Sequence, residues 1–471
     1  RQAALLDPNC AMAYWGQALA LGPNINAPMS AEHGRQAYDA IRLASTSKAS
    51  EKERAYIDAL ARRYSNDESQ DRKALDKAYA EAMRDLAKRY PQDDDVQTLF
   101  AAALMNLRPW DYWQKDGRPY PETEEVVPTL ETVLKRNPSH IGANHYYIHA
   151  VEGTDSPERA VPAADRLQAE VTGAGHLVHM PAHVYMRVGR YADASDANVR
   201  AIAADEDYIT QCRAQGIYPL AYYPHNIHFL WASSSMEGRS EVAMEAARKV
   251  ASRVEVKKID DLPSWARIFT VIPLYAKARF GMWDEILQEK QPHLDRPFYT
   301  GIWHYARGLA FTAKGQLGRA QSELYRLRAL AGDPAVAKLE VGSTTVGSLF
   351  GIATSVLAGE IAGRQRNYDK AISQLTLAVL LQDGLPYTEP PDWYYPVRQS
   401  LGAVLLEAEY PAEAETVYWE DLKRNPENGW SLFGLAQSLK AQGKNEQAAE
   451  IEMRFQRAWE RADVTLVASR F

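Results

Sequence analysis

The chain has 471 residues, of which 46% are hydrophobic and 24% are charged, and its formal net charge is −7. This composition supports a packed core and excludes bulk disorder, while the acidic balance argues against nucleic acid as a partner, because nucleic-acid-binding domains carry basic stripes. No apolar run approaches the roughly 20 residues that span a bilayer, so no membrane span is predicted. The two cysteines, Cys10 and Cys212, lie far apart and exclude a disulfide scaffold or a cysteine-rich metal module.

One pattern recurs in chain order and predicts pairs of helices. A glycine or another small residue closes one helix, an aromatic or large residue follows about two positions later, and alanine comes three positions further on. Phrases containing proline open units at 6–19, 89–104 and 136–150, and the clearest copies of the pattern start at Gly189, Gly238, Gly281, Gly315, Asn367, Tyr410 and Gly443. This pattern resembles the tetratricopeptide repeat (TPR), a helix–turn–helix unit of about 34 residues.

The resemblance implies an all-α fold, a right-handed α-solenoid of TPR-like helix–turn–helix repeats with long loop insertions. We expect one superhelical domain over 1–471, with N-terminal repeats in 1–136, histidine-rich repeats in 137–254 and C-terminal repeats in 255–471. The stretches 22–29, 108–121 and 213–224 are rich in proline, glycine and aromatic residues, which predicts long loops or lids. The first repeat begins within what should be its second helix, so an upstream helix is expected. The alternative is an ordinary helical protein with coincidental spacing.

The histidines carry the strongest chemical signal. Seven of the 11 lie between residues 145 and 228, where an even spread would place about two. Counted within the repeats, they fall at positions 2, 5 and 9 of three successive first helices, which face the concave groove in proteins of this class. We therefore expect the seven rings to converge; they are His145, His149, His176, His179, His183, His225 and His228.

This pattern predicts a transition-metal site. Imidazole suits zinc, copper, iron and nickel, and a histidine pair four residues apart on a helix can chelate one ion. A nearly all-nitrogen set favours copper or zinc, held as one ion or two. The alternatives are a groove that binds an anionic or peptide ligand without metal, and coincidence. Pro181 complicates the register: if it starts a helix, His183 stays helical but His176 and His179 move into the preceding turn.

Neighbouring residues are candidates for supporting roles. Metal-bound imidazoles usually donate their second N–H to an acceptor, and Glu152, Asn144 and Asn226 are the nearest candidates. An aromatic loop precedes the first histidine pair, and its side chains form either a ligand lid or anchors for the insertion; they are Trp110, Tyr112 and Trp113. A second aromatic group, at 392–395 with Arg398, has the same two interpretations.

The phrases GANHYYIHAVE (142–152), GHLVHMPAHVYMRVGRY (175–191) and YYPHNIHFLW (222–231) resemble a histidine-rich bacterial family of TPR proteins. That resemblance implies an exported, periplasmic location and supplies no reaction. No HExxH, GxSxG, P-loop, dinucleotide-binding or haem-attachment motif occurs.

The predicted function is a solenoid that binds copper or zinc in a histidine-lined pocket, with a peptide or small molecule as partner in the concave groove. Two alternatives stay open. The first is a metalloenzyme, which would be either a copper oxidase-like enzyme or a zinc-dependent hydrolase. The second is a metal-free adaptor for protein partners.

Overall fold

A computed structural model describes the chain except for residues 1, 68, 213–217, 254–263 and 293–295. The fold is all-α, as predicted, with stacked helix–turn–helix repeats in each of two compact units, Arg1–Glu170 and Val171–Phe471. The division after Glu170 falls inside the predicted histidine-rich region. A single continuous superhelix over 1–471, with its internal boundaries at 136 and 254, stays a prediction.

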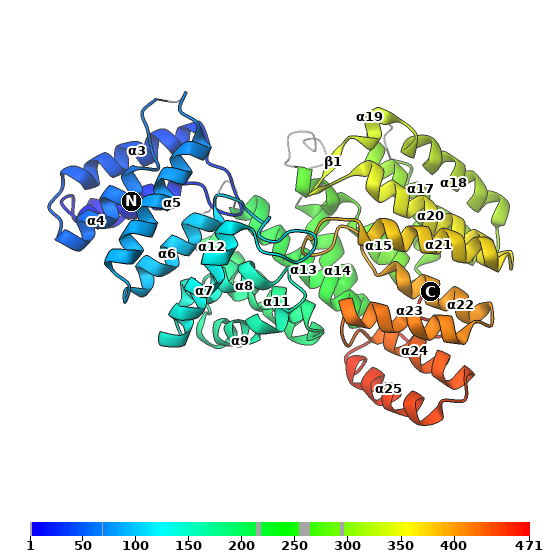
Figure 1. The fold of residues 1–471 in the computed structure, drawn as a ribbon. Coiled ribbons are helices and arrows are strands. Elements are labelled where there is room, and N and C mark those ends of the chain that lie inside the picture. Colours follow the sequence, from blue (N-terminus) through cyan, green and yellow to red (C-terminus); the bar gives the residue numbers. More distant parts are fainter. Residues whose placement is uncertain (1, 68, 213–217, 254–263, 293–295) are drawn as a thin grey trace. The chain divides into compact units, whose positions relative to one another are not determined.

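The first unit contains four packed helix pairs after a short N-terminal helix. The pairs are α2 with α3, α4 with α5, α6 with α7, and α8 with α9 (Figure 1). The bounds are α1 Gln2–Leu6, α2 Ala11–Leu21, α3 Ala31–Thr46, α4 Glu51–Ala61, α5 Arg72–Arg89, α6 Asp94–Met105, α7 Pro121–Arg136, α8 Ile141–Val151, the 3₁₀ turn η1 Pro157–Ala160 and α9 Val161–Glu170.

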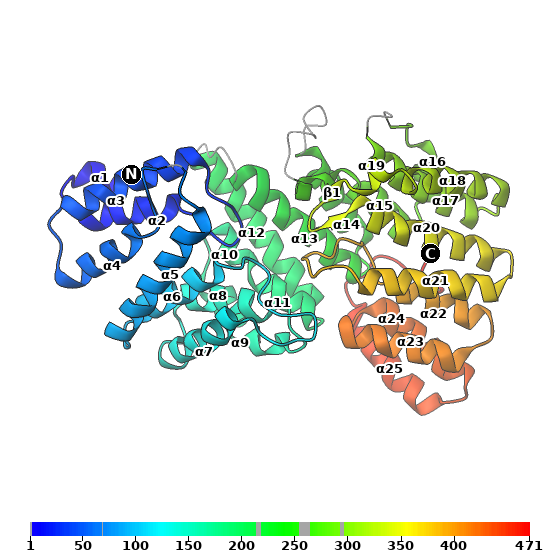
Figure 2. The same ribbon diagram turned by 45° about the horizontal axis from the view of Figure 1, so that its top comes forward.

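The second unit continues the same arrangement. Figures 1 and 2 show α20 beside α21 and α24 beside α25, two of its closely packed pairs. The bounds are α10 Gly175–His179, α11 Pro181–Arg187, α12 Tyr191–Cys212, the π turn η2 Tyr218–Tyr222, α13 Tyr223–Met236, α14 Ser240–Ser252, the 3₁₀ segment η4 Ser264–Thr270, α15 Ile272–Arg279, α16 Trp283–Gln288, α17 Pro297–Ala313, α18 Leu317–Ala331, α19 Pro334–Ala337, α20 Val346–Arg364, α21 Tyr368–Asp383, α22 Val397–Glu407, α23 Pro411–Arg424, α24 Gly429–Ala441 and α25 Asn445–Ala458. One small hairpin, β1 Glu340–Val341 with β2 Thr344–Thr345, precedes α20.

Two of the three predicted loops are present. Residues 22–29 and 106–120 contain no helix and are closed by isolated backbone bridges. The third prediction, a loop over 213–224, is wrong where the structure describes it. Residues 218–222 form the π turn and lead directly into α13, because Pro224 sits in the first turn of that helix, where its missing N–H costs nothing. Residues 213–217 lie outside the described part.

The last repeat of the second unit returns to the repeats near its start. The indole N–H of Trp430 donates to the carbonyl of Ser235 at the end of α13, over 3.0 Å. Asp463 accepts hydrogen bonds from the backbone N–H groups of Ser240 (2.6 Å) and Glu241 (3.0 Å), which are free donors at the start of α14. The C-terminal segment therefore supports α13 and α14.

Among the described helices, only α20 is long and apolar enough to cross a bilayer. Of its most apolar window, 72% is buried inside the protein, as in the central helix of a packed repeat array.

Small residues at the helix seams let large side chains pack between neighbouring helices. Tyr418 of α23 is fully buried between Gly402 of α22 and Gly434 of α24. A Cβ atom at Gly434 would lie 2.1 Å from Cζ of Tyr418, and the tyrosine cannot withdraw easily because its hydroxyl is hydrogen-bonded to Ser469 at 2.7 Å.

We therefore expect Gly434→Ala to lower the free energy of unfolding by about 1–3 kcal/mol, the usual cost of overpacking a core. The matched control is Gly318→Ala in α18, where a Cβ would meet no atom within 4 Å. Urea unfolding of both variants, followed by tryptophan fluorescence, checks this, and equal stabilities would contradict the close packing described here.

Candidate metal centre

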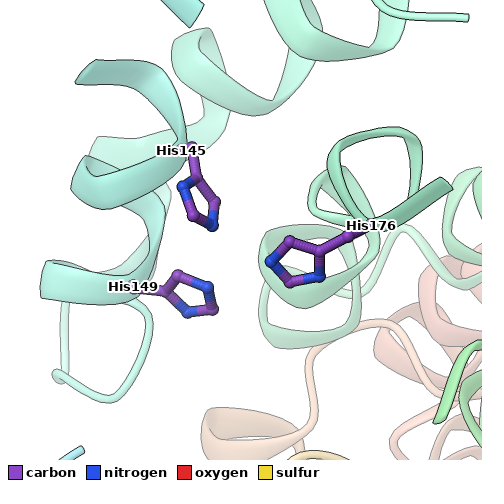
Figure 3. Close-up of side chains that lie close together, drawn as sticks. All are labelled: His145, His149 and His176. Atoms are coloured by element: carbon purple, nitrogen blue, oxygen red, sulfur yellow. The ribbon is translucent and has the colours of Figure 1, made fainter. Parts of the chain in front are cut away.

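Two of the seven histidines belong to the first unit. His145 and His149 lie one helical turn apart on α8, and Figure 3 shows their rings projecting from the same side of that helix. The ring centroids are 4.9 Å apart. The helix begins where the His140 ring accepts a hydrogen bond from the N–H of Ala143, which fixes the register of the pair. A spacing of four residues thus produces the chelating arrangement predicted for this helix.

His149 is buried and has two further neighbours within its own unit. Its Nδ1 lies 3.0 Å from Oε1 of Glu152, a carboxylate that is 1% exposed. The edge of Trp110 approaches the ring, with centroids 5.0 Å apart. Glu152 therefore contacts a histidine, as a supporting residue would, and Trp110 lies against the same ring.

The other two aromatic residues of this loop hold it to the first unit. The Trp113 indole donates to the carbonyl of Ala150 over 2.7 Å. Tyr112 is buried, its carbonyl accepts from the Thr123 hydroxyl, and burial raises the pKa of its phenol above the usual range. These contacts match the anchoring alternative for Tyr112 and Trp113, whereas Trp110 stays 43% exposed beside His149.

Three histidines of the second unit come together in what we call the three-histidine cluster: His179, His183 and His225. They offer one nitrogen each, and these nitrogens lie within 4.8 Å of one another. Pro181 is the first residue of α11, which places His183 on that helix and His179 at the end of the short α10. His176 and His179 are thus helical, in a separate short helix, rather than in a turn. His225 comes from the first turn of α13.

The outer nitrogen of His179 has a hydrogen-bond partner, and that of His183 lies close to a carboxylate. Asn198 donates its amide N–H to the carbonyl of Ala194, so its oxygen is the atom that faces Nδ1 of His179 at 2.7 Å. Nδ1 of His183 lies 2.7 Å from Oε2 of Glu389, a carboxylate that is mostly buried. Nδ1 of His179 therefore carries hydrogen, and in the neutral ring its lone pair is on Nε2. A hydrogen on Nδ1 of His183, on the side of Glu389, would leave a lone pair on Nε2 of that ring as well if it is neutral.

The two Nε2 atoms face each other at 2.8 Å. Burial, followed by the neighbouring His183 and His225, lowers the pKa of His179 well below 6.5, so that ring is neutral at pH 7. At this distance the two nitrogens either share one hydrogen or, if both carry lone pairs, repel unless a cation lies between them. Zinc–nitrogen bonds of about 2.0–2.1 Å set tetrahedral ligand atoms about 3.3 Å apart, so a shift of about half an ångström admits an ion.

The hydrophobic wall of the cluster is Phe229, one turn after His225 on α13. Its ring centroid lies 4.6 Å from that of His179, 4.7 Å from that of His183 and 5.1 Å from that of His225. Such a wall excludes water from one side and strengthens the interaction between nitrogen ligands and a cation. Phe229 and Glu389 also line a cavity of about 340 Å³, together with Asp392, whose pKa burial raises to about 7.

The remaining predicted residues of the second unit are outside the three-histidine cluster, although the His176 ring lies beside it, with its centroid 6.4 Å from that of His179. The His176 ring packs against Tyr222, with centroids 5.0 Å apart. His228 stacks on Trp231 at 5.2 Å and meets the edge of Phe269, and burial there lowers its pKa to about 3. Asn226 donates to Asp205 over 2.7 Å.

Asn144, in the first unit, closes the start of α8. Its amide donates to the carbonyls of Pro138 and His140, and its oxygen accepts from Arg166. The prediction that all seven histidines share one pocket spans the two units and stays a prediction.

Sequence reasoning missed the two acceptors of the cluster. Asn198 lies on α12, the second helix of its repeat, which the groove-facing pattern does not include. Glu389 lies about 200 residues after His183 and just before the aromatic group at 392–395. That aromatic group was noted, but nothing in its composition connects it with the histidines.

No known family model matches the chain, and no curated protein matches it in sequence. Solved structures similar to it are helical-repeat proteins. Human IFIT1, solved as a dimer with m7Gppp-AAAA, has a TM-score of 0.35 and 11% identity over 90% of this chain and 86% of its own. Yeast Tom70 has a TM-score of 0.29 and 13% identity over 83% of this chain and 90% of its own. The assembly chaperone Acl4 has a TM-score of 0.25 and 14% identity over 70% of this chain and 99% of its own. The chain has the helix–turn–helix repeat architecture that its own helices define, and likeness at this level says nothing of its ligands.

The environment of His228 predicts a pH effect on stability. Its folded pKa of about 3 lies below the ordinary 6.5, so below pH 6.5 the unfolded chain binds a proton that the folded ring does not. The contribution of His228 to the free energy of unfolding is therefore fully present above pH 6.5. It falls by up to about 1.4 kcal/mol per pH unit as the pH drops towards 3. His228→Phe keeps the stacking without the titration. Urea unfolding should show that the free energy of unfolding of the variant, relative to that of the wild type, is greater at about pH 5.5 than at about pH 7.5. A difference between the two proteins that does not change with pH would contradict this.

Proposed function

We propose that this protein is a metal-binding TPR-like solenoid whose second unit holds one transition-metal ion, copper or zinc, in the three-histidine cluster. The ligands are Nε2 of His179, Nε2 of His183 and one ring nitrogen of His225. The observation that carries the proposal is the pair of Nε2 atoms facing each other at 2.8 Å while both Nδ1 atoms face oxygen acceptors. Histidine ligands of metals are oriented in this way by an acceptor behind the ring.

The donor set favours copper or zinc. Three neutral nitrogen ligands with no carboxylate among them suit borderline-soft ions, whereas magnesium, calcium and manganese prefer oxygen. His145 and His149 on α8, supported by Glu152, form a second chelating pair, so the proposal includes one or two ions for the whole chain. In this proposal the chain belongs to the histidine-rich bacterial family of the sequence analysis, is exported, and takes a peptide or small molecule in its groove.

The test measures metal content in protein purified without a metal-affinity tag. After chelation and dialysis against zinc or copper, we expect at least one ion per chain by elemental analysis. His183→Ala combined with His225→Ala should remove one equivalent, because a single imidazole does not retain the ion. His228→Phe, on the same helix as His225 but outside the cluster, is the matched control and should keep full occupancy.

The two acceptors allow a finer test of the same proposal. Glu389→Gln and Asn198→Leu leave all three imidazoles in place but weaken their orientation, so each should reduce metal affinity by about 10–100-fold. Competition with a chromophoric chelator measures this. Unchanged affinity in both variants, or a metal-free wild-type protein whose melting curve ignores chelator, would support the metal-free adaptor instead.

A second candidate function, metalloenzyme, is favoured by one observation. Three protein ligands beside a cavity are typical of catalytic zinc, which keeps its fourth position for water or substrate. Phe229 and Glu389 contact the cluster and also line the cavity of about 340 Å³. In this candidate, Asp392 is the acid–base group, because its pKa of about 7 suits proton transfer near neutral pH.

Cobalt(II) substitution distinguishes the two functions. An open fourth position should let azide change the visible absorption of the cobalt protein, with saturation at one azide per ion. A closed, structural site should give a spectrum that azide does not alter. His228→Phe again serves as the control, since it should behave like the wild type in either case.

A further inference from the structure

A second cavity in the second unit contains a buried cation that forms no ion pair with any carboxylate in the part of the chain that the structure describes. The cavity has a volume of about 480 Å³, and α15, α17, α20 and α22 contribute to its walls. Arg279, the last residue of α15, lines it and is only 5% exposed. The volume is within the range of small-molecule sites in proteins, roughly 300–1,000 Å³.

The direct contacts of the Arg279 guanidinium are with aromatic rings, and Asp421 acts on it only at longer range. Its guanidinium lies 3.5 Å from the ring centroid of Trp430 and 5.4 Å from that of Tyr395. Its Nη2 atom is buried and has no hydrogen-bond partner in the part of the chain that the structure describes. Burial lowers the pKa of this guanidinium to about 9. A buried charge without a partner costs several kcal/mol, so its presence on a cavity wall calls for an occupant.

The charges around the cavity leave a positive excess. Arg470 is neutralised, because it lies 3.2 Å from Glu360 and 2.9 Å from Glu407. Burial raises the pKa of Glu360, and Arg470 beside it opposes that shift. Arg364 and Arg366, at the exposed end of α20, also line the cavity and have no carboxylate partner among the described residues.

We infer that this cavity binds a small organic oxyanion, a phosphate or a carboxylate on a compact apolar body, with the anionic group on Arg279. A guanidinium offers paired donors that match both oxyanions, and a fixed, desolvated one loses little entropy on binding. The body of the ligand would lie against the aromatic and aliphatic part of the wall, which includes Trp283, Leu309 and Tyr394. The site is separate from the three-histidine cluster and does not depend on bound metal.

The experiment titrates the metal-free full chain with phenyl phosphate, benzoate and phenol by calorimetry, with thermal unfolding as a second readout. We expect one of the two anions to bind at one per chain and to raise the melting temperature, and phenol not to bind. The preferred anion distinguishes the phosphate from the carboxylate ligand class. Binding of phenol as tight as that of the anions, or no binding by either anion, overturns the inference.

Arg279→Met should reduce affinity for the preferred anion at least tenfold. Because this change removes a desolvated charge and keeps an apolar side chain, the melting temperature of the free variant should not fall. Arg326→Met, at an exposed position of α18, is the matched control and should bind like the wild type. A variant with a lower melting temperature and unchanged anion binding would give Arg279 a purely structural role.

Arg279→Lys covers the case in which the methionine variant does not fold. Lysine keeps the positive charge but loses the planar, paired donors, so it should bind the anion more weakly than arginine. Equal affinity of the lysine variant would overturn the assignment of the anionic group to Arg279.

Discussion

The site in the second unit depends on how many hydrogens a neutral imidazole carries. Asn198 faces Nδ1 of His179, Glu389 lies beside Nδ1 of His183, and the inner nitrogens of the two rings are 2.8 Å apart. If both rings are neutral with hydrogen on Nδ1, two lone pairs oppose each other, and the proposed metal ion would relieve their repulsion. Both rings are buried and packed against Phe229, which restricts how far they can move apart.

The packing of the surrounding helices stabilises the three-histidine cluster. The cluster joins three helices, and α13 is held at its far end by the C-terminal repeat through Trp430 and Ser235. Asp463 caps α14 behind it, which satisfies donors that would otherwise need water. Contacts between helices therefore hold the geometry of the cluster.

The repeat pattern was sufficient to predict the fold, because small residues at regular spacing can only serve close helix packing. It also predicted that His145 and His149 lie one turn apart on the same helix, whereas the helix start at Pro181 entered only as a complication of the register. The pattern failed for His228. By periodicity it shares a helix face with His225, but three residues rotate a helix by about 300° and not by a full turn. The side chain of His228 therefore points to one side and stacks on Trp231. Glu389 could not be predicted, since a contact across about 200 residues leaves no trace in one sequence.

The segment 386–395 takes part in two separate regions of the second unit. Glu389 in this segment contacts His183, and Tyr394 and Tyr395 at its end line the cavity around Arg279. A substitution that alters the backbone of this segment should therefore disturb both regions, although neither proposed site needs the other to be occupied.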